Sequence, residues 1–238
     1  MKPTRHDRAL VLRVSPYGEA DAVVQLFTAR EGVTPALARR ARSATPRRQA
    51  MVLEPFHTLA VELQRGSGEL AVLKASSLSS ARTALLESPG KLDAAGLITR
   101  WTRALSPAHV PEPEVFDALE KALDAIAEGV EVDAVLTIFG LTLLDALGYG
   151  LELSACARCG RERPAGRAAY VGGAQGGVLC ESCRRGMTLD TPLVAGALLD
   201  RIEGHDLVGV PVDEIAPLAR VVASAIQSRA QALGARLS

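Results

Sequence analysis

Four cysteines are spaced along the chain as two pairs that could share one metal ion. They are the only cysteines among the 238 residues, and 20 residues separate the pairs. The first pair is Cys156 with Cys159, and the second is Cys180 with Cys183. Each C-x2-C pair can wrap one side of a tetrahedral zinc ion. The spacing therefore predicts a structural zinc site, in which no coordination position is left for water or substrate.

Two other interpretations fit the same cysteine spacing: a pair of disulfides, or a C-x-x-C redox pair. Disulfides belong to an oxidising compartment, but residues 1–7 are polar and charged and lack the apolar run of a signal peptide. A redox pair needs only one C-x-x-C and a thioredoxin-like setting, which helix-rich flanks do not provide. We expect the metal site, in a cytoplasmic protein.

Helical periodicity on both sides of the cysteines predicts the elements that must hold the zinc segment. From about residue 80, apolar residues recur every three or four positions, with one stripe at 97–105 and another at 115–126. Asp133 is predicted to cap a buried helix that is apolar almost all round and ends at Gly148. Later apolar repeats predict a short helix and a long final one. The zinc module, at about 153–186, is therefore expected as an insertion in a helical domain of residues 81–238.

The first eighty residues carry a different pattern, which predicts strands. Short runs rich in β-branched and apolar residues are bounded by turn signals such as Ser15-Pro16-Tyr17-Gly18. The runs cover residues 9–14, 22–27, 33–38, 56–63 and 70–73. Five short strands can close into a small barrel without a free edge. The predicted fold class is α+β, with a barrel domain at 1–80 followed by the helical domain.

The net charge is zero, but the charge is distributed unevenly along the chain. Residues 1–80 have 12 Lys and Arg against 7 Asp and Glu, residues 81–155 have 5 against 12, and residues 156–185 have 6 against 2. A basic front, an acidic middle and a basic zinc module favour anionic partners for the first and third parts. The longest apolar stretch, 134–144, is too short to cross a bilayer.

Arginines concentrate after the third predicted strand, without an acid among them. The guanidinium fork fits phosphate oxygens, so the cluster predicts a nucleic-acid backbone contact. The alternative is a solvated loop that its charge keeps off the edge of the sheet. A second contact is possible beside the last cysteine, where solvation explains the arginines equally well. The candidates are Arg30, Arg39, Arg40, Arg42, Arg47, Arg48, Arg184 and Arg185.

Few aromatic residues accompany these arginines. Tyr17, Phe27 and Phe56 are the nearest rings, and the two phenylalanines are expected in the core. Base stacking should therefore be weak, and binding should depend steeply on salt and little on sequence.

Catalytic constellations are absent from the sequence pattern. The histidines at 6, 57, 109 and 205 are scattered without metal or triad spacing, and no G-x-x-x-x-G-K-[ST] loop occurs. The acids of the middle segment follow helical spacings typical of a solvent face. We do not expect an enzyme.

The chain resembles the RecO family of bacterial DNA repair proteins. The resemblance rests on residues 9–21, Leu26-Phe27-Thr28, Ala38-Arg39-Arg40-Ala41-Arg42 and Leu53-Glu54-Pro55-Phe56, and on the cysteine segments. It covers nearly the whole chain in order. It implies an N-terminal OB-fold, a helical C-terminal domain and, in many members, a four-cysteine zinc module.

The resemblance also implies a function without catalysis. It implies binding to single- and double-stranded DNA, annealing of complementary strands, and partnership with RecR and the single-strand binding protein to load RecA on gapped DNA. The resemblance further implies a location in the cytoplasm, in association with the nucleoid. Two alternatives stay open: an RNA-binding protein, since OB-folds and zinc ribbons are common in translation, and a pure protein scaffold.

Overall fold

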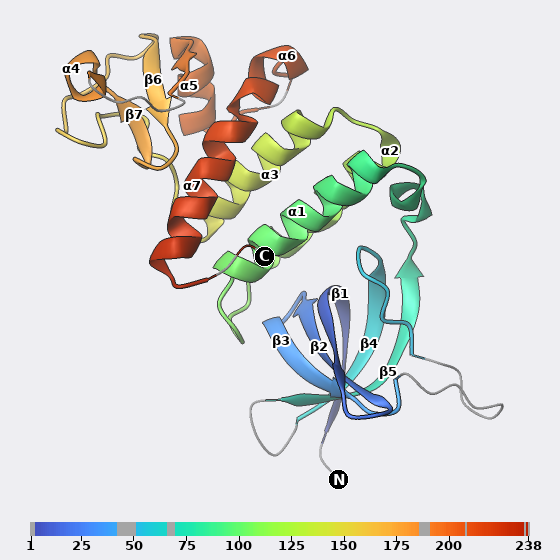
Figure 1. Cartoon of the computed structure of the whole chain (residues 1–238). Helices are drawn as coiled ribbons and strands as arrows, with labels where there is room; N and C mark the ends of the chain where they lie inside the picture. The colour runs from blue at the N-terminus through green and yellow to red at the C-terminus, as the bar shows by residue number, and fades with distance from the viewer. Residues whose placement is uncertain are drawn as a thin grey trace. The chain divides into compact units, whose positions relative to one another are not determined.

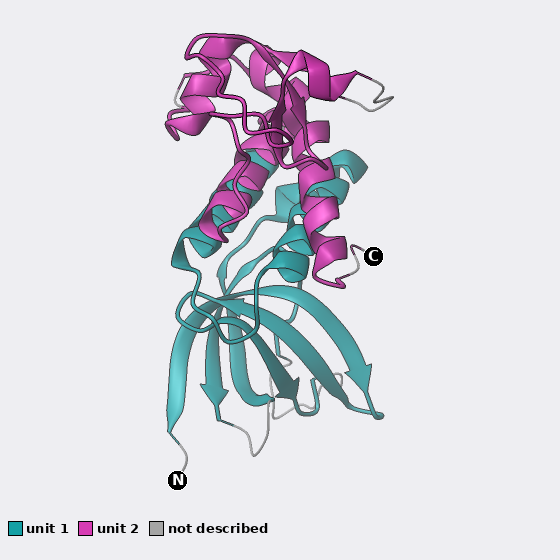
Figure 2. Cartoon of the chain, turned by 90° about the vertical axis from the view of Figure 1, so that its left-hand side faces the viewer, with its two compact units in different colours: residues 1–128 teal, residues 129–238 magenta. Residues whose placement is uncertain are grey.

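A computed structural model describes residues 3–41, 51–65, 70–185, 191–207, 209–235 and 237. The chain forms two compact units, residues 1–128 and 129–238, which Figure 2 shows in different colours. The first unit includes two helices that follow residue 80. The domain boundary expected at residue 80 stays a prediction. Across the described ranges, no helix combines the length and the hydropathy needed to span a membrane.

The first unit begins with a closed five-stranded barrel, as predicted (Figure 1). Its strands close in the order β1-β2-β3-β5-β4; β3 and β5 are parallel, and the other neighbours are antiparallel. Alternate side chains fill the interior with small and branched apolar groups, among them Val24, Leu26 and Val61. The strands are β1 (Thr4–Tyr17), β2 (Asp21–Thr28), β3 (Gly32–Ala38), β4 (Thr58–Gln64) and β5 (Ala71–Ser80).

Two strands are longer than their apolar runs predict. Strand β1 begins at Thr4 and β5 continues to Ser80, although both extensions are polar. Both extensions pair with β4, so backbone hydrogen bonding rather than hydrophobic pattern sets their length. Phe56, expected in β4, lies before that strand at a positive φ of 70°.

Helices complete the first unit. A 3-10 turn, η1 (Thr83–Glu87), leads into α1 (Pro89–Leu105), and α2 follows (Pro113–Glu128). The predicted apolar stripes are buried on both helices: Trp101 of α1 is 1% exposed, and Val115, Leu119 and Ile126 of α2 are fully buried. Phe27 of β2 packs against Phe116 of α2, with ring centroids 5.7 Å apart. The barrel and this helical hairpin therefore share apolar contacts.

In the second unit, one long helix precedes the cysteine segment along the chain and another follows it. The central helix α3 (Val132–Ala146) packs against the C-terminal helix α7 (Ala219–Ala232). Between them lie β6 (Ala169–Gly172), β7 (Gly177–Leu179), α4 (Glu181–Arg184), β8 (Leu193–Val194), α5 (Gly196–Glu203), α6 (Val212–Ile215) and the 3-10 turn η2 (Ala216–Leu218). The three short strands form a sheet in the order β7-β6-β8.

Two details of the second unit correct the sequence predictions. Asp133 is not the cap of α3: the helix begins at Val132, and the Glu131 carboxylate accepts the Ala134 N–H at 2.7 Å. The cap therefore lies two residues earlier, where a carboxylate can reach the free N–H groups of the first turn. The long final helix is divided into α6, η2 and α7, with Pro217 in the 3-10 turn.

Candidate metal centre and nucleic-acid interface

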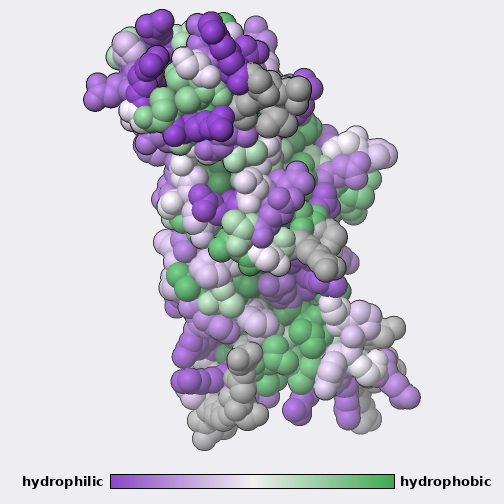
Figure 3. All heavy atoms as spheres, turned by 60° about the vertical axis from the view of Figure 1, so that its left-hand side comes forward, coloured by the Kyte–Doolittle hydropathy of each residue, from purple (hydrophilic) through white to green (hydrophobic). Residues whose placement is uncertain are grey.

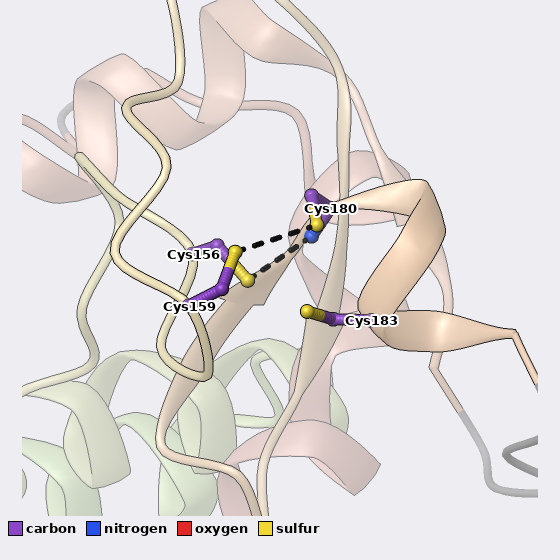
Figure 4. A group of neighbouring side chains, drawn as sticks. All are labelled: Cys156, Cys159, Cys180 and Cys183. Atoms are coloured by element: carbon purple, nitrogen blue, oxygen red, sulfur yellow. Dashed lines mark hydrogen bonds between the residues drawn. The ribbon is translucent and has the colours of Figure 1, made fainter.

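The four cysteines converge on one point in the second unit (Figure 4). Their sulfur atoms all lie within 4.8 Å of one another, and those of Cys159 and Cys180 are 3.7 Å apart. Tetrahedral coordination with bonds of about 2.3 Å places sulfur atoms roughly 3.8 Å apart. The cluster could therefore hold a metal ion, and four thiolates are a donor set that suits zinc.

Local backbone turns aim the two pairs of sulfurs at each other. Gly160 follows the first pair with a φ of 70°, and its N–H donates to the Cys156 carbonyl at 2.8 Å. Glycine reaches this left-handed conformation at no steric cost. The second pair frames the first turn of α4, and the Cys180 N–H donates to the Cys156 sulfur at 3.4 Å. Each pair is thus held on its own tight turn.

Proton sharing within the cluster drives the thiol pKa values apart. Burial raises the pKa of Cys156, but N–H groups of Cys180, Arg158 and Cys159 outweigh it and lower that pKa to about 6. The pKa of Cys183 is raised to about 12, chiefly because its thiol hydrogen-bonds to the sulfurs of Cys180 and Cys159. A cation would favour all four thiolates together, so metal affinity should fall as the pH falls.

A buried arginine fastens the metal module to helix α5. The Arg163 side chain is only 5% exposed, and its guanidinium donates to Asp200 at 2.7 Å and to Glu203 at 3.2 Å. It also donates to the carbonyls of Leu153 at 2.7 Å and Arg167 at 3.2 Å. Residues on both sides of the first cysteine pair are therefore tied to one side chain.

The barrel carries a second candidate site on its outer face. Strand register places Ser15, Val23, Leu37 and Val72 in one row across β1, β2, β3 and β5. Side chains alternate along a strand, so these point away from the buried interior. Figure 3 shows hydrophobic side chains gathered over the barrel with hydrophilic ones around them.

Basic groups flank this apolar row. The last residue of β3, Ala38, pairs with Ala22 and Leu73, so Arg39 follows the strand end next to the positions of Asp21 and Lys74, and the register pairs Tyr17 with Asp21. Arg39 and Lys74 are exposed, as is the ring of Tyr17 at 59%. Arg13 is exposed in the register row on the other side of the apolar one. We call Arg13, Tyr17, Val23, Leu37, Arg39, Val72 and Lys74 the barrel face.

Like charges accumulate where helix α1 approaches strand β1. Burial lowers the pKa of Arg103 from its usual value, and the nearby guanidiniums of Arg13 and Arg100 lower it further. Positive groups that lower one another's pKa create a field that attracts anions. This edge of the first unit therefore brings three arginines close together, although the unit's helices are acidic overall.

The structure does not bring all the predicted arginines together. Arg39 and Arg40 lie at the end of β3, whereas Arg30 lies in the turn before it, roughly 20 Å away along the strand. The Arg40 N–H donates to Asp21 at 2.7 Å. Arg42, Arg47 and Arg48 fall outside the described residues.

The arginines beside the last cysteine have partners within the zinc module. Arg184 lies over the Tyr170 ring, 3.8 Å from its centroid, and Arg185 pairs with Glu181 at 3.1 Å. Their role in DNA contact stays a prediction.

Sequence reasoning missed Arg13, Lys74, Arg100 and Arg103. Arg13 and Lys74 each stand alone among apolar or small residues, and Arg100 and Arg103 form only a pair, so local charge density gives little signal. The alternation along each strand indicates on which side of its own strand residue 13 or 74 lies. Whether the two residues share a face depends on the register between strands, which the sequence does not show.

Comparisons with known proteins cover almost the whole chain. A family model described as Recombination protein O N terminal matches residues 1–82, and one described as Recombination protein O C terminal matches residues 86–232. The DNA repair protein RecO of Anaeromyxobacter sp. (strain K) is 38% identical over 211 residues, 87% of this chain and 82% of that protein. That of Geobacter sulfurreducens is 35% identical over 225 residues, 92% of this chain and 90% of that protein.

Proposed function

The chain belongs to the RecO family of DNA repair and recombination proteins, and from that premise we propose that it is a non-enzymatic recombination mediator. It binds single- and double-stranded DNA, anneals complementary strands and, with RecR and the single-strand binding protein as partners, helps to load RecA on gapped DNA. Its place is the cytoplasm, at the nucleoid. The observation that carries the proposal is the barrel face, where apolar and basic side chains lie side by side.

The barrel face supplies the contacts that a single strand needs. OB-folds bind oligonucleotides across strands 2 and 3, between the loop joining strands 1 and 2 and the loop joining strands 4 and 5. The corresponding strands carry Val23 and Leu37, on which bases can lie, and Tyr17 offers a ring for stacking. Arg39 and Lys74 are placed to neutralise the phosphates.

Annealing requires only that the protein reduce the electrostatic repulsion between the two strands. Two complementary strands repel each other through their phosphates, and bound guanidinium and ammonium groups remove part of that repulsion. Base pairing then supplies the free energy, so no nucleotide needs to be hydrolysed. The acidic residues of α2, such as Glu114 and Glu128, repel DNA and leave that helix to protein partners.

The cysteine cluster holds a zinc ion with a structural role in this proposal. Its four thiolates would occupy every position of a tetrahedral ion and leave none for water or substrate. The ion would stabilise the turns of the module, and Arg163 would transmit that order to α5.

Removing charge from the barrel face is expected to weaken DNA binding. The variant Arg39→Gln with Lys74→Gln should lower the affinity for single-stranded DNA about tenfold, because two phosphate contacts are lost. The slope of log affinity against log salt should decrease in magnitude by about 1.4, or about 0.7 per contact. Fluorescence anisotropy of a labelled oligonucleotide at several salt concentrations measures both quantities.

A charge-matched control separates the barrel face from net charge. Arg30→Gln with Lys121→Gln removes the same charge from the turn before β3 and from α2, and should leave the salt slope nearly unchanged. Equal losses in the two variants would contradict the proposed face. Tighter binding of a matched RNA oligomer would favour an RNA-binding function, and no binding of either nucleic acid at low salt would favour a scaffold.

A further inference from the structure

The zinc module contains a pocket that the barrel-face proposal does not use. It has a volume of about 300 Å³, the small end of the range for ligand sites. Buried Val178 and Leu179 of β7 and half-buried Tyr170 of β6 line one side. Residues 161–164 and 167–169, Cys156, and residues 180–182 at the start of α4 complete the lining, so the pocket borders the cysteine cluster and lies wholly within the second unit.

Two arginines at this pocket have side chains without a partner. Within the described ranges, neither Arg161 nor Arg167 forms a side-chain hydrogen bond or ion pair, and both are exposed. The remaining arginines of the module differ, because Arg163 and Arg185 pair with carboxylates, Arg184 lies on Tyr170 and Arg158 donates to the Cys183 carbonyl. The pocket therefore presents two guanidinium groups that are available to an anion.

The wall that carries Arg167 is firmly fixed. Asp200 accepts the Gly166 N–H at 2.7 Å, and Arg163 donates to the Arg167 carbonyl at 3.2 Å. The Arg167 N–H in turn donates to the Pro164 carbonyl at 3.1 Å. This backbone does not need to be ordered by a ligand, which reduces the entropic cost of binding.

The remaining lining favours a nucleotide over a simple anion. Tyr170 presents an aromatic surface whose position is held by Arg184, and a base can lie against it. The Ser182 hydroxyl and the Glu162 carboxylate can accept hydrogen bonds from the N–H groups of a base. Guanidinium forks, an aromatic ring and acceptors together match a phosphate with its base.

We propose that this pocket is a second site for single-stranded nucleic acid, in which Arg161 and Arg167 hold a phosphate and one base lies against Tyr170. The inference rests on the proposed DNA-binding function and extends it. Each compact unit then holds a strand of its own, the barrel face one and the zinc-module pocket another. A single protein molecule can therefore bind both strands that it anneals.

The test uses the full chain with its metal. The variant Arg161→Gln with Arg167→Gln should bind one short oligothymidylate per chain instead of two, by titration calorimetry at low salt, while the barrel-face affinity stays the same. Its rate of annealing complementary oligonucleotides should fall about tenfold. The control variant Arg220→Gln with Arg229→Gln removes the same charge from α7 of the same unit but outside the pocket lining, and should keep both strands.

A crosslinking measurement tests the pocket without a substitution in the pocket itself. Photocrosslinking with an oligonucleotide that contains 5-iododeoxyuridine should give an adduct in the peptide with Tyr170, and this adduct should persist when Arg39→Gln and Lys74→Gln disable the barrel face.

Each outcome of these experiments decides a different point. One bound strand per unaltered chain, located at the barrel face, would overturn the second site and leave the proposed function standing. Equal losses in the Arg161/Arg167 variant and its control would overturn the pocket in favour of diffuse charge. An acidic peptide that binds the pocket while DNA does not would also overturn it. No DNA binding at either site would instead contradict the proposed function itself.

Discussion

Replacing Cys180 by serine is expected to release the metal and loosen the second unit. Metal content measured by plasma mass spectrometry should fall from one ion per chain to less than one tenth. A ligand present at 1,000 times its dissociation constant contributes about 4 kcal/mol to stability. For a chain of this size each kcal/mol shifts the melting temperature by roughly 2–4 °C. The unfolding transition of the chain should therefore move down by about 10 °C.

The substitution Ala157→Ser provides the matched control. Ala157 is exposed between the first two cysteines, so the change adds a hydroxyl to the same turn without removing a ligand. This variant should keep its metal and its melting temperature. Unaltered protein that is folded and metal-free, with four titratable thiols, would contradict the metal site. A metal other than zinc at full occupancy would preserve the site and correct only the ion.

Features that depend on local chemistry could be predicted from the sequence. The cysteine spacing predicts convergence because a C-x2-C turn has few conformations that direct both thiolates to one ion. The stripe of Val115, Leu119 and Ile126 predicts α2 because only a helical period places those residues on one face. The resemblance to the RecO family, which the family models confirm, predicts that the barrel is an OB-fold.

Features that depend on partners distant in sequence could not be predicted. The segment Ser76–Ser80 is polar, and it forms a strand because β4 offers its backbone groups. Arg13 and Lys74 share a face only through the register that places Val23 beside Leu37 and Leu37 beside Val72. Arg184 is a cation next to a cysteine in the sequence, and its position over Tyr170 depends on how β6 packs against α4. The candidate nucleic-acid face is therefore a tertiary feature.

A second large effect is expected at Arg82, which joins the barrel to the helical hairpin of the first unit. Its side chain is only 3% exposed and donates to Asp124 of α2 at 2.6 Å. It also donates to the Phe56 carbonyl and to the Thr58 hydroxyl, each at 3.0 Å. That hydroxyl in turn donates to Glu120 of α2 at 2.6 Å. One buried guanidinium therefore satisfies acceptors on both sides of the junction.

The variant Arg82→Met should keep the volume of the side chain and lose all of these hydrogen bonds. The half-buried Phe56 carbonyl and the buried Thr58 hydroxyl would each lose a partner, at about 1–3 kcal/mol per group. Asp124 is half exposed, so water replaces much of its lost ion pair and a value for a fully buried pair would be too large. We expect the free energy of unfolding of the first unit to fall by about 3 kcal/mol in urea denaturation.

The partner variant Asp124→Asn distinguishes the two contributions. It removes the charge of the exposed partner but leaves Arg82 bonded to Phe56 and Thr58, so the loss should be about 1 kcal/mol or less. Equal losses in the two variants would show that the ion pair dominates and that the buried acceptors matter little. Because Thr58 belongs to β4 and Asp124 to α2, the larger loss for Arg82→Met would mean that this side chain couples the barrel to its helices. The proposed DNA-binding face would then be stabilised through a residue that does not touch it.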